Sequence, residues 1–279
     1  MVQSTAFIED NRAIQSSVWT IRIALFSTAI VVLTALFHRL FGMPTAVALN
    51  LFALSFIGCG FALLIGLFAL VRIWQRGWAG GSNAVTGMII AFLLLAWPLG
   101  VLVKAGDYPR INDVATDLAD PPIFVFATEK RPPGSHDTIY RQEFSSVQKE
   151  SYPDLRTLRV QRAPEAVMEL VRKALQRKRM ILQGEIPFGT SGRDFGQLEA
   201  VDRTLVLGFY DDVVVRVRAV RGGSAVDIRS ASRFGESDFG ANAGRIRALR
   251  TEIVARVEAS VPAGARARRQ RARRQGTSQ

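Results

Sequence analysis

The densest group of acidic and amide side chains lies in a polar segment directly after the last of three apolar runs. Its members are Asn112, Asp113, Asp117 and Asp120. Oxygen atoms of such side chains are the ligands that Ca²⁺ and Mg²⁺ take in proteins, so Asp113 and Asp117, with Asp238 from further along the chain, are candidate metal ligands. Their spacing does not match the EF-hand calcium loop, and Asx residues beside prolines serve equally well in turns and helix caps. A metal site and a structural role therefore stay open.

A second candidate for chemistry is a pair of arginines on a predicted β-hairpin. Asp212–Val220 and Ala225–Ala231 are typical of strands, and the sequence RGGS between them is typical of a two-residue turn, because glycine tolerates positive φ. That turn predicts a register in which Arg216 lies opposite Arg229. Two guanidinium groups directly opposed repel each other. Either both side chains reach water, or the pair forms a patch for a phosphate or carboxylate.

Other reactive side chains are few. The chain has two histidines, His38 at the end of the first apolar run and His136 between Ser135 and Asp137. Neighbours in sequence do not make a catalytic triad, whose members meet in space. The single cysteine, Cys59, can form no disulfide within the chain, and neither zinc-ligand spacing nor a glycine-rich phosphate loop is present. We therefore identify no catalytic residue and expect no cofactor, while enzymatic activity stays open.

Three apolar runs precede the acidic segment and the predicted hairpin. They are Val18–Leu40, a second within Ala46–Val71, and Ala84–Val103, which has no formal charge. Each is long enough for a helix to cross a hydrocarbon core of about 30 Å. A signal peptide is the rival interpretation of the first run, but signal peptides have apolar regions of roughly 7–15 residues. Residues 1–103 are therefore predicted to be a three-helix transmembrane region.

The second run carries a stripe of small residues. Gly58, Ala62 and Gly66 recur at every fourth position, which lets another helix approach closely. The stripe either packs within one three-helix bundle, with Gly87 and Ala91 as its partner, or forms the seam of a homo-oligomer.

Basic residues near the apolar runs indicate an orientation. Those on the N-terminal side are Arg12, Arg22, Arg72 and Arg76, and those on the other side are Arg39, Lys104 and Arg110. Lys and Arg are commoner in cytoplasmic loops. We therefore expect an integral protein of the bacterial inner membrane, with a cytoplasmic N-terminus and a periplasmic soluble domain.

The rest of the chain divides into three parts. Residues 104–150, broken by prolines, are predicted to be an ordered linker. Residues 151–259 are predicted to form an α+β domain with an antiparallel sheet packed against two helices, one starting at Pro164 and the other capped by Asp238. Residues 260–279 carry six arginines of a chain with net charge +12 and are predicted to be disordered. The tail could bind nucleic acid or anionic lipid electrostatically, but it has no aromatic residues to stack on bases, and a solvated tail is the default expectation. We do not expect nucleic acid as a partner.

Three motifs carry a resemblance to a known family. INDVATDLADPP at 111–122, LGFYDDVVVRVR at 207–218 and VDIRSASRFGESDFGANAGRIR at 226–247 resemble the domain of unknown function family fourteen-ninety-nine. The likeness spans roughly residues 107–257, and many bacterial members place apolar spans before the domain. The resemblance implies no activity. It points to signature positions, which are Asn112, Asp113, Asp117, Arg229, Ser230, Ser232, Arg233, Asp238, Asn242 and Arg245. Asp–Arg pairs that dock the linker against the last hairpin and helix are the simpler explanation of these residues.

These observations predict a multi-pass membrane protein with a non-enzymatic α+β domain at the membrane surface, which binds an anionic or amphipathic ligand, such as an anionic lipid, or a protein partner. The candidate ligand-binding residues are Arg216, Arg229, Arg233, Ser230, Ser232, Asn242 and Arg245. One alternative is a divalent-metal-dependent hydrolase that uses Asp113, Asp117 or Asp238. The other is a structural membrane scaffold.

Overall fold

The computed structural model describes residues 2–78, 80–204 and 207–260, with side chains from residue 15 onward except that of residue 191. The chain divides into two compact units. One comprises Met1–Asp107 with Leu205–Phe209, and the other comprises Tyr108–Thr204 with Tyr210–Gln279. The arginine-rich tail predicted over residues 260–279 lies outside the described residues, apart from its first.

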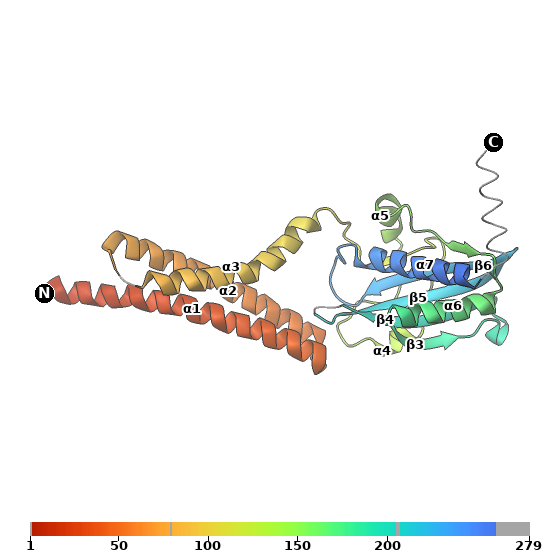
Figure 1. Cartoon of the computed structure of the whole chain (residues 1–279), viewed down its shortest axis with the longest axis horizontal. Helices are drawn as coiled ribbons and strands as arrows, with labels where there is room; N and C mark the ends of the chain where they lie inside the picture. The colour runs from red at the N-terminus through yellow and green to blue at the C-terminus, as the bar shows by residue number, and fades with distance from the viewer. Residues whose placement is uncertain (1, 79, 205–206, 261–279) are drawn as a thin grey trace. The chain divides into compact units, whose positions relative to one another are not determined.

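The first unit is built from three helices, α1 (Val2–Leu40), α2 (Thr45–Arg76) and α3 (Gly81–Ala105) (Figure 1). Gln15–Leu40 of α1 and the whole of α2 and α3 are long and apolar enough to cross a membrane. Helix α2 ends at Arg76, because the next residue, Gly77, has a left-handed backbone (φ 67°) that stops the helix. The three apolar helices predicted from the sequence are therefore confirmed.

Small residues let these helices approach closely. A Cβ atom at Gly58 of α2 would lie 2.5 Å from Ser27 Oγ of α1, and one at Gly66 would lie 2.9 Å from Thr20 Cγ2. A Cβ at Gly87 of α3 would lie 2.7 Å from the Ile21 backbone, so this glycine packs on α1 and not on the α2 stripe as we expected. The stripe on α2 is thus used for contacts within the unit.

The second unit contains an antiparallel sheet of six strands in the order β1-β6-β5-β4-β3, with β2 also paired to β6. The strands are β1 (Asp113–Ala115), β2 (Leu158–Val160), β3 (Ile181–Ile186), β4 (Phe195–Arg203), β5 (Tyr210–Val220) and β6 (Gly223–Ser232). The helices are α4 (Phe126–Lys130), α5 (Phe144–Ser151), α6 (Pro164–Arg177) and α7 (Ala241–Ala259), with a 3₁₀ turn at Thr190–Gly192. Strands β1 and β2 therefore lie end to end along one edge of β6.

Helices α6 and α7 cover one face of the sheet (Figure 1). Pro164 occupies the first turn of α6, and the core between helices and sheet includes Val171 of α6, Val215 of β5, Ile228 of β6 and Ile246 of α7, all with at most 1% exposure. Burial of such side chains is the main driving force for this layer. The predicted α+β architecture, an antiparallel sheet packed against two helices, is confirmed.

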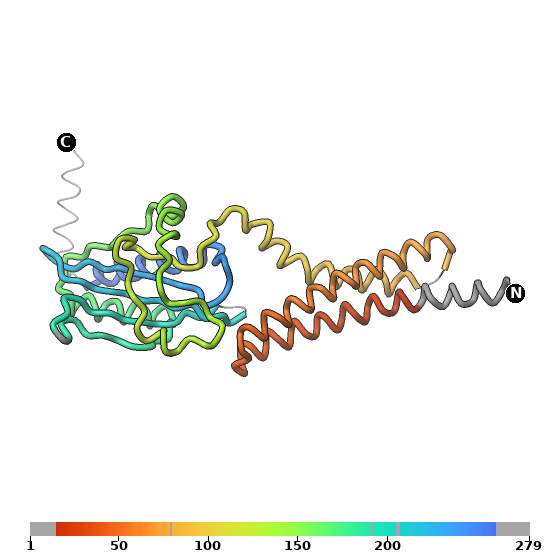
Figure 2. Tube along the Cα trace, turned by 180° about the vertical axis from the view of Figure 1, so that it is seen from behind, coloured from red at the N-terminus to blue at the C-terminus, as the bar shows by residue number. Residues whose placement is uncertain are grey.

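The segment before α5 covers the opposite face of the sheet. Seen from behind, Figure 2 shows the chain from residue 108 to 143 crossing over the strands. Phe124 and Ala127 pack there against Val214 of β5 and Ala231 of β6. A Cβ at Gly184 of β3 would overlap the ring of Phe126 in α4. Residues 104–150, which we predicted to be a linker, thus supply an edge strand and a second covering layer.

The hairpin between β5 and β6 differs from our prediction by a shift of its turn. Val220 pairs with Gly223, so the turn is Arg221-Gly222, and Arg216 lies opposite Asp227 instead of Arg229. The reason is the close approach of β2, since a Cβ at Gly223 would lie 2.9 Å from Gln161 Cα. Gly223 is therefore needed inside the strand, and Gly222 (φ 83°) makes the turn.

Candidate functional site

Arg229 and Asp113 form a buried ion pair between β6 and β1. The Nε of Arg229 donates to Asp113 Oδ1 at 3.0 Å and its Nη2 to Oδ2 at 2.6 Å. The remaining donors reach the carbonyl oxygens of Pro122 (2.9 Å) and Thr138 (2.8 Å), and the guanidinium stacks on Phe124. Arg229 is only 1% exposed, so no part of it is left for a ligand. Burial raises the pKa of Asp113, and the Arg229 guanidinium opposes that rise.

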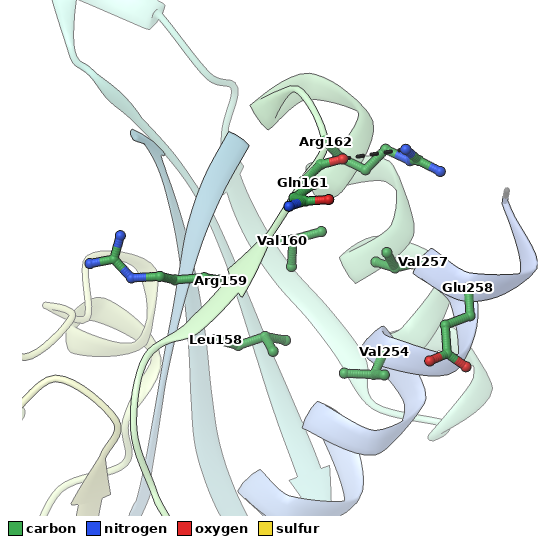
Figure 3. Close-up of a pocket in the computed structure, with 8 residues that line it drawn as sticks. All are labelled: Leu158, Arg159, Val160, Gln161, Arg162, Val254, Val257 and Glu258. Carbon is green, nitrogen blue, oxygen red and sulfur yellow. Dashed lines mark hydrogen bonds between the residues drawn. The ribbon is translucent and has the colours of Figure 1, made fainter. Parts of the chain in front are cut away.

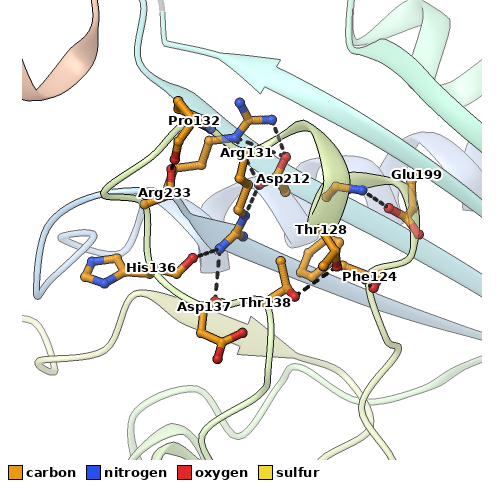
Figure 4. Close-up of polar contacts among 12 residues, drawn as sticks. Phe124, Thr128, Arg131, Pro132, His136, Asp137, Thr138, Glu199, Asp212 and Arg233 are labelled. Carbon is orange, nitrogen blue, oxygen red and sulfur yellow. Dashed lines mark hydrogen bonds and ion pairs between the residues drawn. The ribbon is translucent and has the colours of Figure 1, made fainter.

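Asp212 of β5 holds two arginines on the same face (Figure 4). Arg233 donates through Nε (3.0 Å to Oδ2) and Nη2 (2.6 Å to Oδ1), and Arg131 donates through Nε (2.7 Å to Oδ2). Arg131 also donates to the carbonyl oxygen of His136 at 2.7 Å, which ties the loop after α4 to the sheet. Our sequence reasoning missed Arg131, because no local pattern indicates that its partner lies on β5.

Arg216 and Arg218 of β5 meet carboxylates from the covering segment. Arg216 Nη1 donates to Asp120 Oδ2 at 2.9 Å, and Arg218 Nη2 donates to Asp117 Oδ2 at 2.8 Å and to Asp227 Oδ2 at 2.7 Å. Burial works against the charge of Arg218, but Asp227 and Asp117 outweigh it and raise its pKa. The negative charges beside Arg216 therefore come from the chain's own aspartates, and not from the external anion that one of our two interpretations required.

Arg245 of α7 anchors that helix to one end of the sheet. Its Nε donates to Asp202 Oδ2 at 2.6 Å, its Nη2 to Asp211 Oδ2 at 2.5 Å, and its Nη1 to Ser230 Oγ at 3.0 Å. Burial raises the pKa of Asp211, and the Arg245 charge opposes it. The network is internal, since Arg245 is 9% exposed.

Asn242 and Asp238 organise the start of α7. Asn242 Nδ2 donates to the carbonyl oxygen of Asn112 at 3.0 Å and to Ser232 Oγ at 3.1 Å. Asp238 accepts the backbone N–H groups of Gly240 (2.8 Å) and Asn242 (2.9 Å). We predicted Asp238 as the N-cap, but the N-cap residue is Gly240, and Asp238 caps the helix from two residues before it. Burial raises the pKa of Asp238, and these two N–H groups oppose the rise.

The structure does not bring the three predicted metal ligands together. Asp113 binds Arg229, Asp117 binds Arg218, and Asp238 caps α7. Within the described residues, no group of three or more His, Cys, Asp or Glu side chains is placed to hold a metal ion. The seven predicted ligand-binding residues likewise take part in internal networks. Arg216 and Arg229 pair with aspartates of residues 104–150, whereas Arg233 and Arg245 pair with aspartates of the sheet itself.

An apolar groove lies instead between β2 and the end of α7 (Figure 3). Its volume is about 300 Å³, and the lining residues are Leu158, Arg159, Val160, Gln161, Arg162, Val254, Val257 and Glu258. Figure 3 shows Leu158 and Val160 directed toward Val254 and Val257, whereas Arg159 points away from the helix. We call this feature the β2–α7 groove. Sequence analysis missed it, although Val257 belongs to an apolar stripe of a predicted helix, because the facing strand has three residues.

Comparison with known protein families matches this chain over the part that contains the sheet. A family model described as protein of unknown function (DUF1499) matches residues 113–253, which contain all six strands. No curated protein matches the chain. Among solved structures, the vertebrate conserved region of human METTL16 is similar at 14% sequence identity, with a TM-score of 0.27, covering 42% of this chain and 88% of that one. A structural likeness of this size supports no conclusion about function.

Proposed function

Because this chain belongs to the DUF1499 family of proteins of unknown function, we propose its role from the geometry of its own residues. The sheet unit is a non-enzymatic binding module, held at a membrane by the three apolar helices, that takes an amphipathic ligand into the β2–α7 groove. One observation carries the proposal. The polar candidates are paired inside the fold, whereas the groove keeps Leu158, Val254 and Val257 half-exposed at the surface.

The size and walls of the groove favour a short apolar group. Binding pockets for small molecules start at roughly 300 Å³ and are lined mainly by apolar side chains with a few polar groups. Leu158, Val160, Val254 and Val257 form the walls, and covering them removes apolar surface from water. An acyl or similar chain fits this lining better than a fully polar metabolite.

The rim of the groove presents both charges. Arg162 lies on the strand side and Glu258 on the helix side. An anionic head group gains from Arg162 and is repelled by Glu258. Affinity for an anionic amphiphile should therefore fall in Arg162→Gln and rise in Glu258→Gln. Arg177→Gln, an exposed arginine on α6, is the matched control and should leave affinity unchanged.

The binding experiment uses the full-length protein in nanodiscs of zwitterionic phosphatidylcholine. Binding of cis-parinaric acid, a fluorescent anionic fatty acid, is measured against empty nanodiscs. Val257→Glu should weaken binding by about tenfold or more, because it places a carboxylate in the apolar groove. Ala255→Glu, an exposed position on the same helix, is the control for helix and charge effects. Val254→Trp fills the groove without adding charge and should weaken binding as well.

Other outcomes discriminate the alternatives. Equal binding by the wild type and by Val254→Trp would reject the groove as the site. Thermal stabilisation by Ca²⁺ or Mg²⁺ that EDTA reverses would favour a metal-dependent hydrolase. A protein that responds to neither ligand nor metal would be a structural scaffold.

We further propose a bacterial inner membrane location with the N-terminus in the cytoplasm and the sheet unit in the periplasm. Support comes from Arg22, Arg72 and Arg76, which lie near one end of the helical unit, against Arg39 and Lys104 near the other. Alkaline phosphatase fused to the C-terminus should be active, because it requires an oxidising compartment. An inactive fusion with a fluorescent cytoplasmic GFP counterpart would reverse the assignment.

A further inference from the structure

A second open groove lies in the helical unit, between α1 and α2. It has a volume of about 410 Å³ and is lined by Ser16, Trp19, Leu64, Ile65 and Phe68. Both helices that flank the groove are apolar and long enough to cross a membrane. Arginines stack on two of its aromatic lining residues, Trp19 and Phe68.

The two aromatic walls lie at the same level of the antiparallel helix pair. Ser27 of α1 lies against Gly58 of α2, and Thr20 lies against Gly66. Continuing this register places Trp19, one residue before Thr20, beside the turn that contains Phe68. Both rings therefore flank one segment of the groove.

Two arginines converge on this level from opposite directions. Side chains on a helix slant toward its N-terminus, and α1 and α2 run in opposite directions (Figure 2). Arg22 follows Trp19 on α1 and stacks on its ring with Cζ 5.7 Å from the centroid. Arg72 follows Phe68 on α2 and stacks on that ring at 5.4 Å. Arg22 thus approaches the groove from the side of the C-terminal end of α1, and Arg72 approaches it from the side of the C-terminal end of α2.

The membrane-length parts of the helices carry these arginines without any acidic residue. Residues 15–105 contain no Asp or Glu, although they include Arg22, Arg39, Arg72, Arg76 and Lys104. Guanidinium groups bind phosphate through paired hydrogen bonds. In a span that lies in a bilayer, the abundant source of phosphate beside an apolar groove is a phospholipid.

We propose that the α1–α2 groove is a binding site for an anionic phospholipid. The phosphate lies between Arg22 and Arg72, and an acyl chain lies along Leu64 and Ile65. Trp19 and Phe68 position the arginines by stacking, which keeps the guanidinium planes over the groove. The site is separate from the β2–α7 groove, so either can fail without the other.

The test is native mass spectrometry of the full-length protein in detergent with added lipid. Phosphatidylglycerol and phosphatidylcholine of the same acyl chains are compared. The wild type should retain phosphatidylglycerol roughly tenfold more tightly, which corresponds to about 1.4 kcal/mol, because arginines attract an anionic head group. Arg22→Gln with Arg72→Gln should abolish this preference. The matched control is Lys104→Gln with Arg110→Gln, which removes the same charge at exposed positions outside the groove and should keep the preference.

Equal loss of preference in both double variants would mean attraction by net charge alone and would overturn the proposal, as would equal retention in both. A second measurement does not depend on the arginine variant folding. Trp19 becomes the sole tryptophan after Trp74, Trp78 and Trp97 are changed to Phe. Brominated-chain phosphatidylglycerol should then quench Trp19 more strongly than brominated phosphatidylcholine at equal mole fraction, and equal quenching would reject the site.

Discussion

Removal of the Asp113 carboxylate is the most informative test of how the covering segment is held. In Asp113→Ala, the guanidinium of Arg229 stays buried, because it is 1% exposed and still held by the carbonyl oxygens of Pro122 and Thr138. It loses a carboxylate that accepts from both Nε and Nη2. Leaving one member of a buried pair uncompensated costs about 3–5 kcal/mol.

The apolar double variant decides whether that cost is the stranded charge. Asp113→Ala with Arg229→Met removes the buried charge as well as the pair, and buried ion pairs replaced by apolar residues are often close to neutral. We therefore expect the double variant to be more stable than Asp113→Ala alone, with a coupling energy of roughly 2 kcal/mol or more.

The assay is thermal unfolding of the full-length protein together with hydrogen exchange of the β1 and β6 amides. For a unit of this size, a loss of 1 kcal/mol lowers Tm by about 2–4 °C, so Asp113→Ala should lower Tm by roughly 10 °C. Amides of Asp113–Ala115 should lose protection first, because β1 is the strand released. An Asp113→Ala variant within about 1 kcal/mol of wild type, or a double variant whose cost equals the sum of the single costs, would refute the reasoning.

Three further predictions concern other parts of the sheet unit. Gly223→Ala should destabilise by roughly 1–3 kcal/mol through overlap with the β2 backbone, and chemical denaturation should show a smaller loss for Gly222→Ala, which has open space around it but a φ of 83°. Glu199→Gln should cost roughly 1.5–3 kcal/mol, because the buried carboxylate accepts the N–H groups of residues 125 and 127 at 2.6 and 2.9 Å, and hydrogen exchange should show early loss of protection in α4. The third prediction concerns pH and rests on the raised pKa of Asp238. Because the folded pKa lies above the usual value of 3.8, the stability that this group contributes is full below that value and is lost as pH rises through the folded pKa. Asp238→Asn removes this loss, so the difference in Tm between pH 7 and pH 4 should become more positive than in the wild type, and an unchanged difference would contradict the assignment.

Local patterns in the sequence were sufficient for much of the architecture. The apolar runs predicted α1, α2 and α3 because a membrane-length helix needs only length and absence of charge. Pro164 and the helical spacing after it predicted α6, and alternation with a glycine turn predicted β5 and β6. These properties belong to residues near one another in the chain.

Partners and register depended on contacts between distant segments. The RGGS turn allows two positions that differ by one residue, and the approach of β2 to Gly223 selected between them. That shift placed Asp227 opposite Arg216 and removed the arginine pair on which we had based an anion site. The covering segment has too little local periodicity to show which face it packs on, and residues such as Gln148, which pairs with both backbone groups of Ala115, act only after the chain has folded back.

The same contrast between local sequence and contacts of distant segments applies to the candidate site. The sequence was enough to single out Asp113 and Asp117, because acidic residues are concentrated there, and Arg229, because it lies on a predicted hairpin strand and at a position to which the family resemblance points. Whether such charges are free for a ligand depends on what lies within a few ångströms of them, and Asp113 is 116 residues away from Arg229 along the chain. Coulomb attraction acts through space and not through sequence. In the folded domain the predicted binding residues therefore pair with other groups of the domain, and the open β2–α7 groove is lined mainly by apolar residues that the sequence had not indicated as a site.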